Sequence, residues 1–162
     1  MKKKCILFFL FNSLCFSSQY CAFCDPEVIG YQSFYEGELI LALCTHKPVL
    51  PGHCLIIPKR HVERFEMLTD SEILEIGQVI RKVNQAVMQE FQTISYLLLQ
   101  KNGQEAGQTV PHVHFHYIPR KEGDDSAISF MLKMLIANLK KPLQSDEMEG
   151  NVQKIKHAMQ QQ

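Results

Sequence analysis

The chain has 162 residues, of which 46% are hydrophobic, so it is long enough for one domain with a real core and too short to expect two. Its 17 lysines and arginines balance 17 acidic residues, and no dense basic block marks an RNA or membrane surface. We therefore expect no nucleic-acid partner and no stable membrane association, and any phosphate ligand must be held by local groups.

The first twenty residues have two possible interpretations. Three lysines (2–4) precede an apolar run (5–16) and two serines (17–18), which is the order of a secretory signal peptide. The apolar run is too short to span a bilayer comfortably. The alternative is an extended start, with the domain beginning at Cys21. In both cases we expect the residues before about Gln19 to contribute nothing to the fold.

Two strands joined by a rigid loop are predicted next, over 38–43 and 53–58, because both segments are almost continuously apolar and the loop contains prolines and a glycine. Cys44 and Cys54 lie in or beside these runs and are expected to be small buried side chains.

A long amphipathic helix is predicted over 70–91. Thr69 and Glu72 form a capping box at its start, and apolar residues then recur at steps of three and four. A third apolar strand over 94–99 and a polar loop over 101–107 follow.

The segment 110–118 alternates residue by residue, which predicts a strand with His112, His114 and His116 on one face. Pro119 is expected to end this strand. A helix is predicted over 128–139, and the glutamine-rich end from Gln144 is expected to be a frayed helix or tail.

These elements predict an α+β fold, in which an antiparallel sheet carries the long helix on one face. Val113, Phe115 and Tyr117 alternate with the three histidines and would face this helix. The histidine face would then be left open for a ligand.

Two chemistries use a row of histidines on one face of a strand. In the first, one imidazole is a nucleophile toward phosphorus, while its neighbours orient it and hold the phosphoryl oxygens. In the second, a catalytic metal is bound by His112, His114 and His53, with Glu105 as the candidate general base. The residues alone leave both possibilities open.

The histidine segment and its surroundings resemble the histidine triad (HIT) family of nucleotide-binding phosphohydrolases, over roughly 21–124. The resemblance rests on three motifs: GQTVPHVHFH over 107–116, PRK at 119–121 with GD at 123–124, and PGH at 51–53 followed by LIIPK at 55–59. The second of these motifs is similar to the fragile-histidine-triad branch, the dinucleoside polyphosphate hydrolases. The resemblance implies a HIT-like fold and hydrolysis of a phosphoanhydride or phosphoramidate without a catalytic cofactor.

The family's residue roles can be carried over position by position. His114 matches the nucleophile that forms a nucleotidyl-histidine intermediate, and His116 matches the histidine that contacts the phosphoryl oxygens. Gln108 matches the amide that holds the bridging or leaving oxygen. His112 matches the residue whose backbone carbonyl fixes the nucleophile's tautomer. His53 matches another histidine that lies near the first triad member in the family, and a capping hydrogen bond after the Pro-Gly turn is the alternative role for it.

The resemblance also implies a purine nucleotide substrate, with two departures from the family pattern. Thr45 stands where relatives usually carry an aspartate or asparagine that binds the ribose hydroxyls. Lys101 stands where many carry an amide near the phosphates, and the adjacent Asn102 is a further candidate for substrate binding. A lysine could favour a longer, more negative polyphosphate.

Cys21 and Cys24 form a Cys-x-x-Cys pair, a moderate metal signal in its own right. In many bacterial family members, two such cysteines, a histidine at the position of His61 and the first triad histidine, here His112, hold a structural zinc. The resemblance therefore implies a structural zinc on these four residues.

The resemblance further implies a homodimer. It favours a cytoplasmic location, since nucleotide substrates are scarce outside the cytosol, although a true signal peptide would mean export. We expect three segments: a leader or extended start (1–20), a HIT domain (21–125), and a C-terminal helical extension and tail (126–162). An alternative function is a nucleotide-binding or protein-interaction module whose turnover is incidental.

Overall fold

The computed structural model describes residues 20–124 and 126–162, so the predicted leader lies outside the described residues. No helix of the described part is long and apolar enough to cross a membrane. The helices and strands, in chain order, are α1 (Pro26–Gln32), β1 (Ser33–Glu36), β2 (Ile40–Cys44), β3 (Cys54–Pro58), α2 (Asp70–Phe91), β4 (Ser95–Gln100), β5 (Phe115–Arg120), α3 (Ala127–Ile136) and α4 (Ser145–Gln160). Three single 3-10 turns lie at Phe65–Met67, Gln104–Ala106 and Ala137–Leu139.

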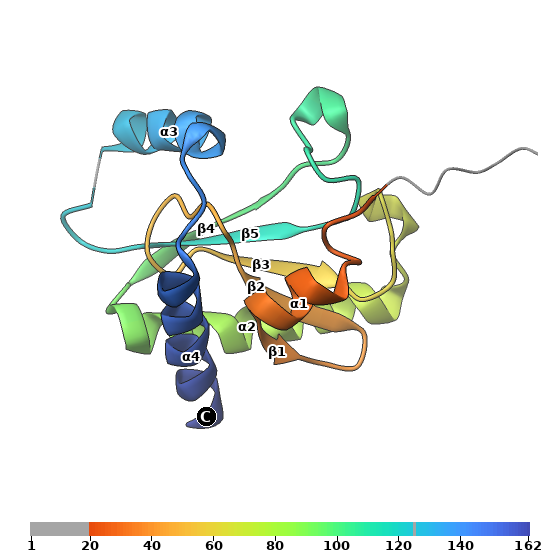
Figure 1. The fold of residues 1–162 in the computed structure, drawn as a ribbon, viewed down its shortest axis with the longest axis horizontal. Coiled ribbons are helices and arrows are strands. Elements are labelled where there is room, and N and C mark those ends of the chain that lie inside the picture. Colours follow the sequence, from red (N-terminus) through yellow and green to blue (C-terminus); the bar gives the residue numbers. More distant parts are fainter. Residues whose placement is uncertain (1–19, 125) are drawn as a thin grey trace, which may run out of the picture.

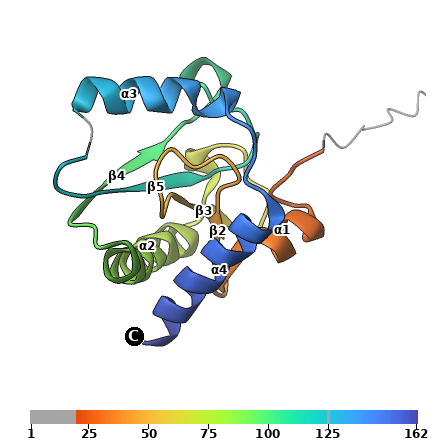
Figure 2. The ribbon, with the colours of Figure 1, turned by 60° about the vertical axis from the view of Figure 1, so that its left-hand side comes forward.

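The five strands form one antiparallel sheet in the order β1-β2-β3-β5-β4, which confirms the predicted α+β fold (Figure 1). Helices α2 and α4 cover one face of this sheet, and α3 lies over the other (Figure 2). Strands β2 and β3 are buried on both faces, which explains why their sequences are continuously apolar rather than alternating.

The main core lies between the sheet and α2. This helix begins at the predicted capping box, in which Thr69 accepts from the backbone N–H of Glu72 and the Glu72 carboxylate accepts from the backbone N–H of Thr69. Its inward side chains include Ile76, Val83 and Val87, and they pack against the alternate strand residues that face them. Val113, Phe115 and Tyr117 belong to this core, as the alternation predicted.

The segment after Gln144, expected to be a frayed helix or tail, is a helix, but it is packed rather than frayed. Residues Ser145–Gln160 form a 16-residue helix, α4, which packs on α2 and β1 and closes the end of the main core. Met148, Val152, Ile155 and Ala158 are buried because they recur at steps of four and three along one side of the helix. The polar glutamines that suggested a tail lie mainly near its C-terminal end and on its exposed side.

The opposite face of the sheet is covered at both ends rather than left open. At one end, Cys21 and Phe23 pack on Leu43, Leu55 and neighbouring strand residues. At the other end, Phe130 of α3 and Ala137 of the following 3-10 turn pack on Ile118 of β5 and Val49 of the loop before β3. The site must therefore lie between these two apolar clusters.

The histidine strand is shorter and later than predicted. Strand β5 begins at Phe115, because the chain before it pairs with a loop instead: the backbone N–H of Val113 donates to the carbonyl of Val62. Pro119 lies within β5, where it is tolerated because pairing with β3 has already ended at Tyr117. The short elements α1 and β1 were not predicted at all.

Candidate active site and metal cluster

A cavity of about 410 Å³ lies on the sheet face opposite α2, between the two apolar clusters. Of the three triad histidines, His114 and His116 line it, whereas His112 does not. The remaining lining residues come from the N-terminal segment (Ala22, Phe23, Val28, Gln32), from strands and loops (Thr45, His46, Lys47, Val49, His53, Leu55, Leu99, Lys101, Thr109, Val110, Ile118) and from the C-terminal segment (Met134, Ala137).

Burial lowers the pKa of the three cavity histidines that lie next to one another, His53, His114 and His116. The pKa of His53 falls to about 4, and that of His116 falls to about 3 because burial is reinforced by the nearby His53, His114 and Lys101. Burial also lowers the pKa of His114, against the opposing effect of its hydrogen bond to the His112 carbonyl. The three imidazoles are therefore neutral near pH 7, and each carries one ring proton.

The position of that proton on His114 follows from its neighbour. Its Nδ1 lies 2.7 Å from the backbone carbonyl oxygen of His112, which can only accept, so Nδ1 carries the proton and donates it. Nε2 therefore keeps its lone pair, on a ring that lines the cavity. The edge of Phe23 packs against this ring at a centroid separation of 5.2 Å and limits its rotation.

The tautomer of His116 follows from a chain of two hydrogen bonds. The backbone N–H of Val49 donates to Nδ1 of His53, at 3.2 Å, so the proton of neutral His53 is on Nε2. That Nε2 lies 3.0 Å from Nδ1 of His116 and donates to it. The remaining nitrogen of His116, Nε2, must then carry a proton, so the cavity presents a lone pair on His114 beside an N–H donor on His116.

Only some of the residues predicted to bind substrate line the cavity. Thr45 and Lys101 line the cavity, and Lys101 contributes positive charge near His114 and His116. Asn102 does not line it, because its amide accepts from the backbone N–H of Phe65 and donates to Glu66.

Gln108 holds the loop that carries the histidines. Its oxygen accepts from the backbone N–H of Gly103 at 2.6 Å, and its nitrogen contacts the carbonyls of Glu63 and Val110 at 3.0 Å and, more distantly, that of His112. It does not line the cavity either, so its predicted contact with a substrate oxygen remains a prediction.

The four residues predicted to bind zinc are brought together beside the cavity. One ligand atom from each of Cys21, Cys24, His61 and His112 lies within 4.8 Å of the others. Nδ1 of His112 lies 3.4 Å and 3.6 Å from the sulfurs of Cys21 and Cys24, and Nδ1 of His61 lies 3.4 Å from Cys24. A tetrahedral zinc with ordinary bond lengths would separate sulfur from nitrogen by about 3.6 Å, so the cluster has the size that zinc requires.

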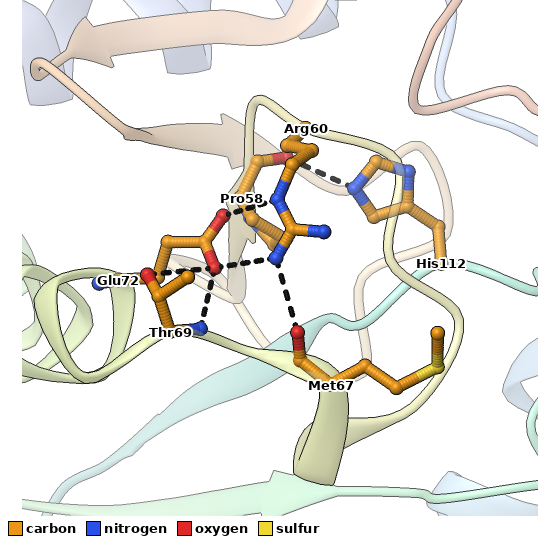
Figure 3. Close-up of polar contacts among 6 residues, drawn as sticks. All are labelled: Pro58, Arg60, Met67, Thr69, Glu72 and His112. Atoms are coloured by element: carbon orange, nitrogen blue, oxygen red, sulfur yellow. Dashed lines mark hydrogen bonds and ion pairs between the residues drawn. The ribbon is translucent and has the colours of Figure 1, made fainter.

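The ring of His112 is set for metal binding through Nδ1. Its Nε2 lies 2.9 Å from the backbone carbonyl oxygen of Pro58 and donates to it, which leaves the lone pair on Nδ1 (Figure 3). The pKa of His112 falls to about 4, chiefly through burial. His112 therefore serves both sites at once: its ring faces the cysteines and its carbonyl holds His114.

The loop that carries His61 is fixed by a buried carboxylate. Arg60 donates two hydrogen bonds to Glu72, at 3.1 and 2.8 Å, and a third to the carbonyl of Met67 (Figure 3). Glu72 is only 3% exposed and is also the acceptor of the α2 capping box, so helix α2, Arg60 and the loop are held as one unit. This network places His61, the next residue, against the cysteines.

The alternative catalytic metal site is not assembled in the described residues. His53 bonds to His116, while His112 turns its free nitrogen toward the cysteines instead of toward His53. Glu105, its candidate general base, is exposed on a 3-10 turn and does not line the cavity. The geometry thus favours a nucleophilic histidine.

Several cavity residues were not predicted, notably Phe23, Val49, Met134 and Ala137. Phe23 lies inside the Cys-x-x-Cys loop, so its position beside the site could have been inferred from the metal cluster. The other three carry no chemical signal, because an aliphatic side chain looks the same in a core and in a cavity wall.

Comparison with known proteins is consistent with this geometry. A HIT-domain family model matches residues 27–123. The chain is 45% identical over 98 residues to the asymmetrical bis(5'-nucleosyl)-tetraphosphatase of Schizosaccharomyces pombe, over 60% of this chain and 54% of that protein. It is 42% identical over 91 residues to the bis(5'-adenosyl)-triphosphatase of Dictyostelium discoideum, over 56% of this chain and 61% of that protein. The chain thus spans little more than half the length of these relatives.

Among solved structures, the fold is similar to a histidine triad nucleotide-binding protein of Sulfolobus tokodaii. The TM-score is 0.70 at 27% identity, and the match covers 87% of this chain and 93% of that one. The similarity therefore extends beyond the segment matched by the family model.

Proposed function

This chain belongs to the HIT-domain family, and from that premise we propose that it hydrolyses dinucleoside polyphosphates or nucleoside phosphoramidates at the α-phosphate through a covalent nucleotidyl-histidine. The observation that carries the proposal is the hydrogen bond from Nδ1 of His114 to the His112 carbonyl, which leaves the opposite nitrogen as a nucleophile. Two relatives are named as a bis(5'-nucleosyl)-tetraphosphatase and a bis(5'-adenosyl)-triphosphatase, which supports dinucleoside polyphosphates as the substrate class.

In the first step, the lone pair on Nε2 of His114 attacks the α-phosphorus and the bond to the bridging oxygen or nitrogen breaks. The leaving group takes that electron pair. The imidazole becomes positively charged, and the His112 carbonyl, which accepts from Nδ1, stabilises this charge. The N–H at Nε2 of His116 and the ammonium group of Lys101 face the negative charge on the phosphoryl oxygens.

In the second step, water attacks the same phosphorus, the P–N bond breaks, and its electron pair returns to Nε2 of His114. One proton of the water stays on the product phosphate, and the other passes to the leaving group or to solvent. The products are a nucleoside monophosphate and the leaving group, with His114 in its starting tautomer. His53 acts as a positioning residue here, because it touches His116 rather than the substrate's reacting atoms in this scheme. We also propose that Gln108 contacts the bridging oxygen, after its loop changes conformation on substrate binding.

The cluster of Cys21, Cys24, His61 and His112 would hold a structural zinc. The separations between sulfur and nitrogen atoms and the bond from Nε2 of His112 to Pro58 support this assignment. Four protein ligands would close the coordination shell, so the metal would anchor the N-terminal segment to the histidine loop without entering the reaction.

The proposed partner besides the nucleotide is a second copy of this chain. Strand β4 is an edge of the sheet, and Ile94, Tyr96 and Leu98 on or beside it are exposed by two-fifths or more. Edge strands with exposed apolar side chains are pairing surfaces, and twofold pairs are the commonest oligomers. Sedimentation as a monomer at micromolar concentration would contradict the dimer.

A cytoplasmic location also remains our proposal, and cell fractionation tests it.

The activity is tested by hydrolysis of diadenosine tetraphosphate and adenosine 5'-phosphoramidate in water enriched in oxygen-18, without a chelator and, in a second reaction, with a strong chelator present. We expect the heavy oxygen in AMP, because water attacks the α-phosphorus. His116→Ala should keep partial activity, whereas His157→Ala, on the exposed side of α4, should match the wild type. Heavy oxygen found only in the triphosphate product, or no hydrolysis of either compound, would contradict the proposal.

A further inference from the structure

The outward side of helix α3 is an exposed apolar surface. Its members recur at spacings of three and four residues and so lie on one side of the helix and of the 3-10 turn that follows: Ile128, Met131, Leu132, Leu135, Ile136 and Leu139. We call these six residues the outer face of α3. Leu135 is 75% exposed and Leu139 is 84% exposed. Figure 1 and Figure 2 both show α3 outside the sheet, on the side away from α2.

The inward side of the same helix is fixed to the rest of the protein. Phe130 and Ala137 are buried, and the guanidinium of Arg120 lies over the ring of Phe130, at 4.3 Å from the ring centre. After the helix, the backbone N–H of Leu143 donates to the carbonyl of His46, at 2.9 Å. The helix therefore cannot turn its outer face inward, and a contiguous apolar surface held outward is typical of an interaction site.

The segment that carries the outer face has a local excess of positive charge. Between residues 120 and 144, five basic residues outnumber three acidic ones, and all three acids precede α3. From α3 to residue 144 there is no aspartate or glutamate, and there are three lysines: Lys133, Lys140 and Lys141. Before the helix, Asp124 is paired with Arg120. The charge balance of the whole chain thus conceals a segment that is both apolar and basic.

A bilayer with anionic headgroups fits both properties of this segment. Hydrocarbon needs no hydrogen-bond partner, and the outer face consists of aliphatic and thioether side chains only. Lipid phosphates attract the lysines beside the face, and the long lysine stems keep the ammonium groups at the level of the headgroups.

Two protein occupants fit the outer face less well. In a twofold pair of this chain, the same surface would meet itself, so the lysines of one copy would face the lysines of the other. Binding energy in interfaces between folded proteins is concentrated in tryptophan, tyrosine and arginine anchors, and none of the six residues is of these types.

We propose that the outer face of α3 docks reversibly on an anionic membrane surface, with the helix lying in the plane of the interface. The balanced charge of the whole chain argued against a stable association, whereas the local charge of this segment supports a reversible one. The proposal is independent of the proposed function, because none of the six residues lines the cavity that holds His114.

The test is flotation of the full chain with vesicles of phosphatidylcholine and with vesicles of equal parts phosphatidylcholine and phosphatidylglycerol. We expect binding to the mixed vesicles to be at least about tenfold tighter at low salt, and high salt should remove most of this difference. Leu135→Gln should weaken binding to the mixed vesicles about 5- to 20-fold. Leu74→Gln is the matched control, because Leu74 is 66% exposed on α2, on the opposite face of the sheet.

The contribution of charge is tested with a pair of lysine variants. The double substitution Lys140→Gln and Lys141→Gln should weaken binding to the mixed vesicles by about tenfold and leave binding to pure phosphatidylcholine unchanged. Lys154→Gln with Lys156→Gln, which removes two exposed lysines of α4, should bind as the wild type does. Residues 1–19 are the same in all of these proteins, so their effect cancels in each comparison.

Insertion of the face itself can be followed by fluorescence. The chain has no tryptophan, so Leu135→Trp provides a single reporter. Mixing with the anionic vesicles should shift its emission to shorter wavelength, and lipids brominated on their acyl chains should quench it. Leu74→Trp should show neither change.

Three results would overturn the proposal. The first is no flotation of the wild type with either kind of vesicle. The second is flotation that Leu135→Gln and the variant at Lys140 and Lys141 leave unchanged, since another segment would then bind the lipid. The third is a wild-type assembly that Leu135→Gln dissociates in sedimentation, with no shift of Leu135→Trp emission on vesicles, because a second copy would then cover the face. Hydrolytic activity enters none of these measurements, so failure of the proposed function would leave them unaffected.

Discussion

Because His53 is buried beside His116, we expect the protein to lose stability in acid, and we expect the substitution His53→Gln to make this loss smaller. Burial lowers the pKa of His53 to about 4, whereas a histidine in the unfolded chain titrates near 6.5. Between these values the unfolded chain binds a proton that the folded chain excludes. The contribution of neutral His53 to stability is therefore complete above about pH 6.5 and is lost as the pH falls toward 4. From pH 7.5 to pH 5.0 this loss amounts to about 2 kcal/mol.

The assay is urea unfolding of the wild type and His53→Gln at both pH values, with the same zinc concentration throughout. The glutamine amide can donate to His116 but does not titrate, so the acid-induced fall in the free energy of unfolding should be smaller by about 2 kcal/mol in the variant. Both proteins contain the cavity residues Lys47 and Lys101 and the Cys/His cluster. The effects of these groups on the free energy of unfolding therefore cancel when the two proteins are compared. His157→Gln, at an exposed histidine, should behave as the wild type. An equal fall in wild type and His53→Gln would refute the reasoning.

Three further outcomes follow from other parts of the molecule. Tight zinc binding should contribute about 3–4 kcal/mol, so zinc removal or Cys24→Ser should lower the thermal midpoint by roughly 6–16 °C. Elemental analysis should find one zinc per wild-type chain and none in the variant. A wild-type protein without zinc would contradict the site. Met148→Ala should cost about 2–5 kcal/mol in urea unfolding because it opens a cavity under α4, and a cost no larger than that of the exposed Glu149→Ala would show that α4 is not part of the core. Lys101→Met should raise KM more for diadenosine tetraphosphate than for adenosine 5'-phosphoramidate, which carries less negative charge, and an equal rise for both would exclude charge recognition by Lys101.

The parts of the fold that could be predicted are those whose signal is local. The capping box at Thr69 and the three- and four-residue periodicity after it predicted α2 to within a residue at each end. Alternation predicted which side chains of the histidine segment face the core, although strand pairing begins later than expected. The Cys-x-x-Cys pair and two distant histidines were matched to one cluster by family resemblance, and the structure brings them together.

The parts that could not be predicted depend on contacts between distant segments. Helix α4 has a buried stripe through Met148 and Ile155, but its glutamine-rich end concealed that periodicity. Helix α3 is apolar on more than one side, so no pattern shows that Met134 turns toward a cavity. Asn102 illustrates the converse: a polar residue in a suitable loop satisfies its hydrogen bonds with Phe65 and Glu66 instead of a ligand.

The nucleotidyl-histidine intermediate is the central claim, and its capture is the most direct measurement. The wild type and His114→Ala are mixed with radiolabelled diadenosine tetraphosphate and quenched within the first turnovers, and labelled peptides are sequenced. We expect an acid-labile nucleotide on the peptide that contains His114, and essentially no label or turnover in His114→Ala, because the His114 imidazole combines a fixed N–H with a lone pair in the cavity. An unlabelled wild type, together with near wild-type turnover by His114→Ala, would contradict the account.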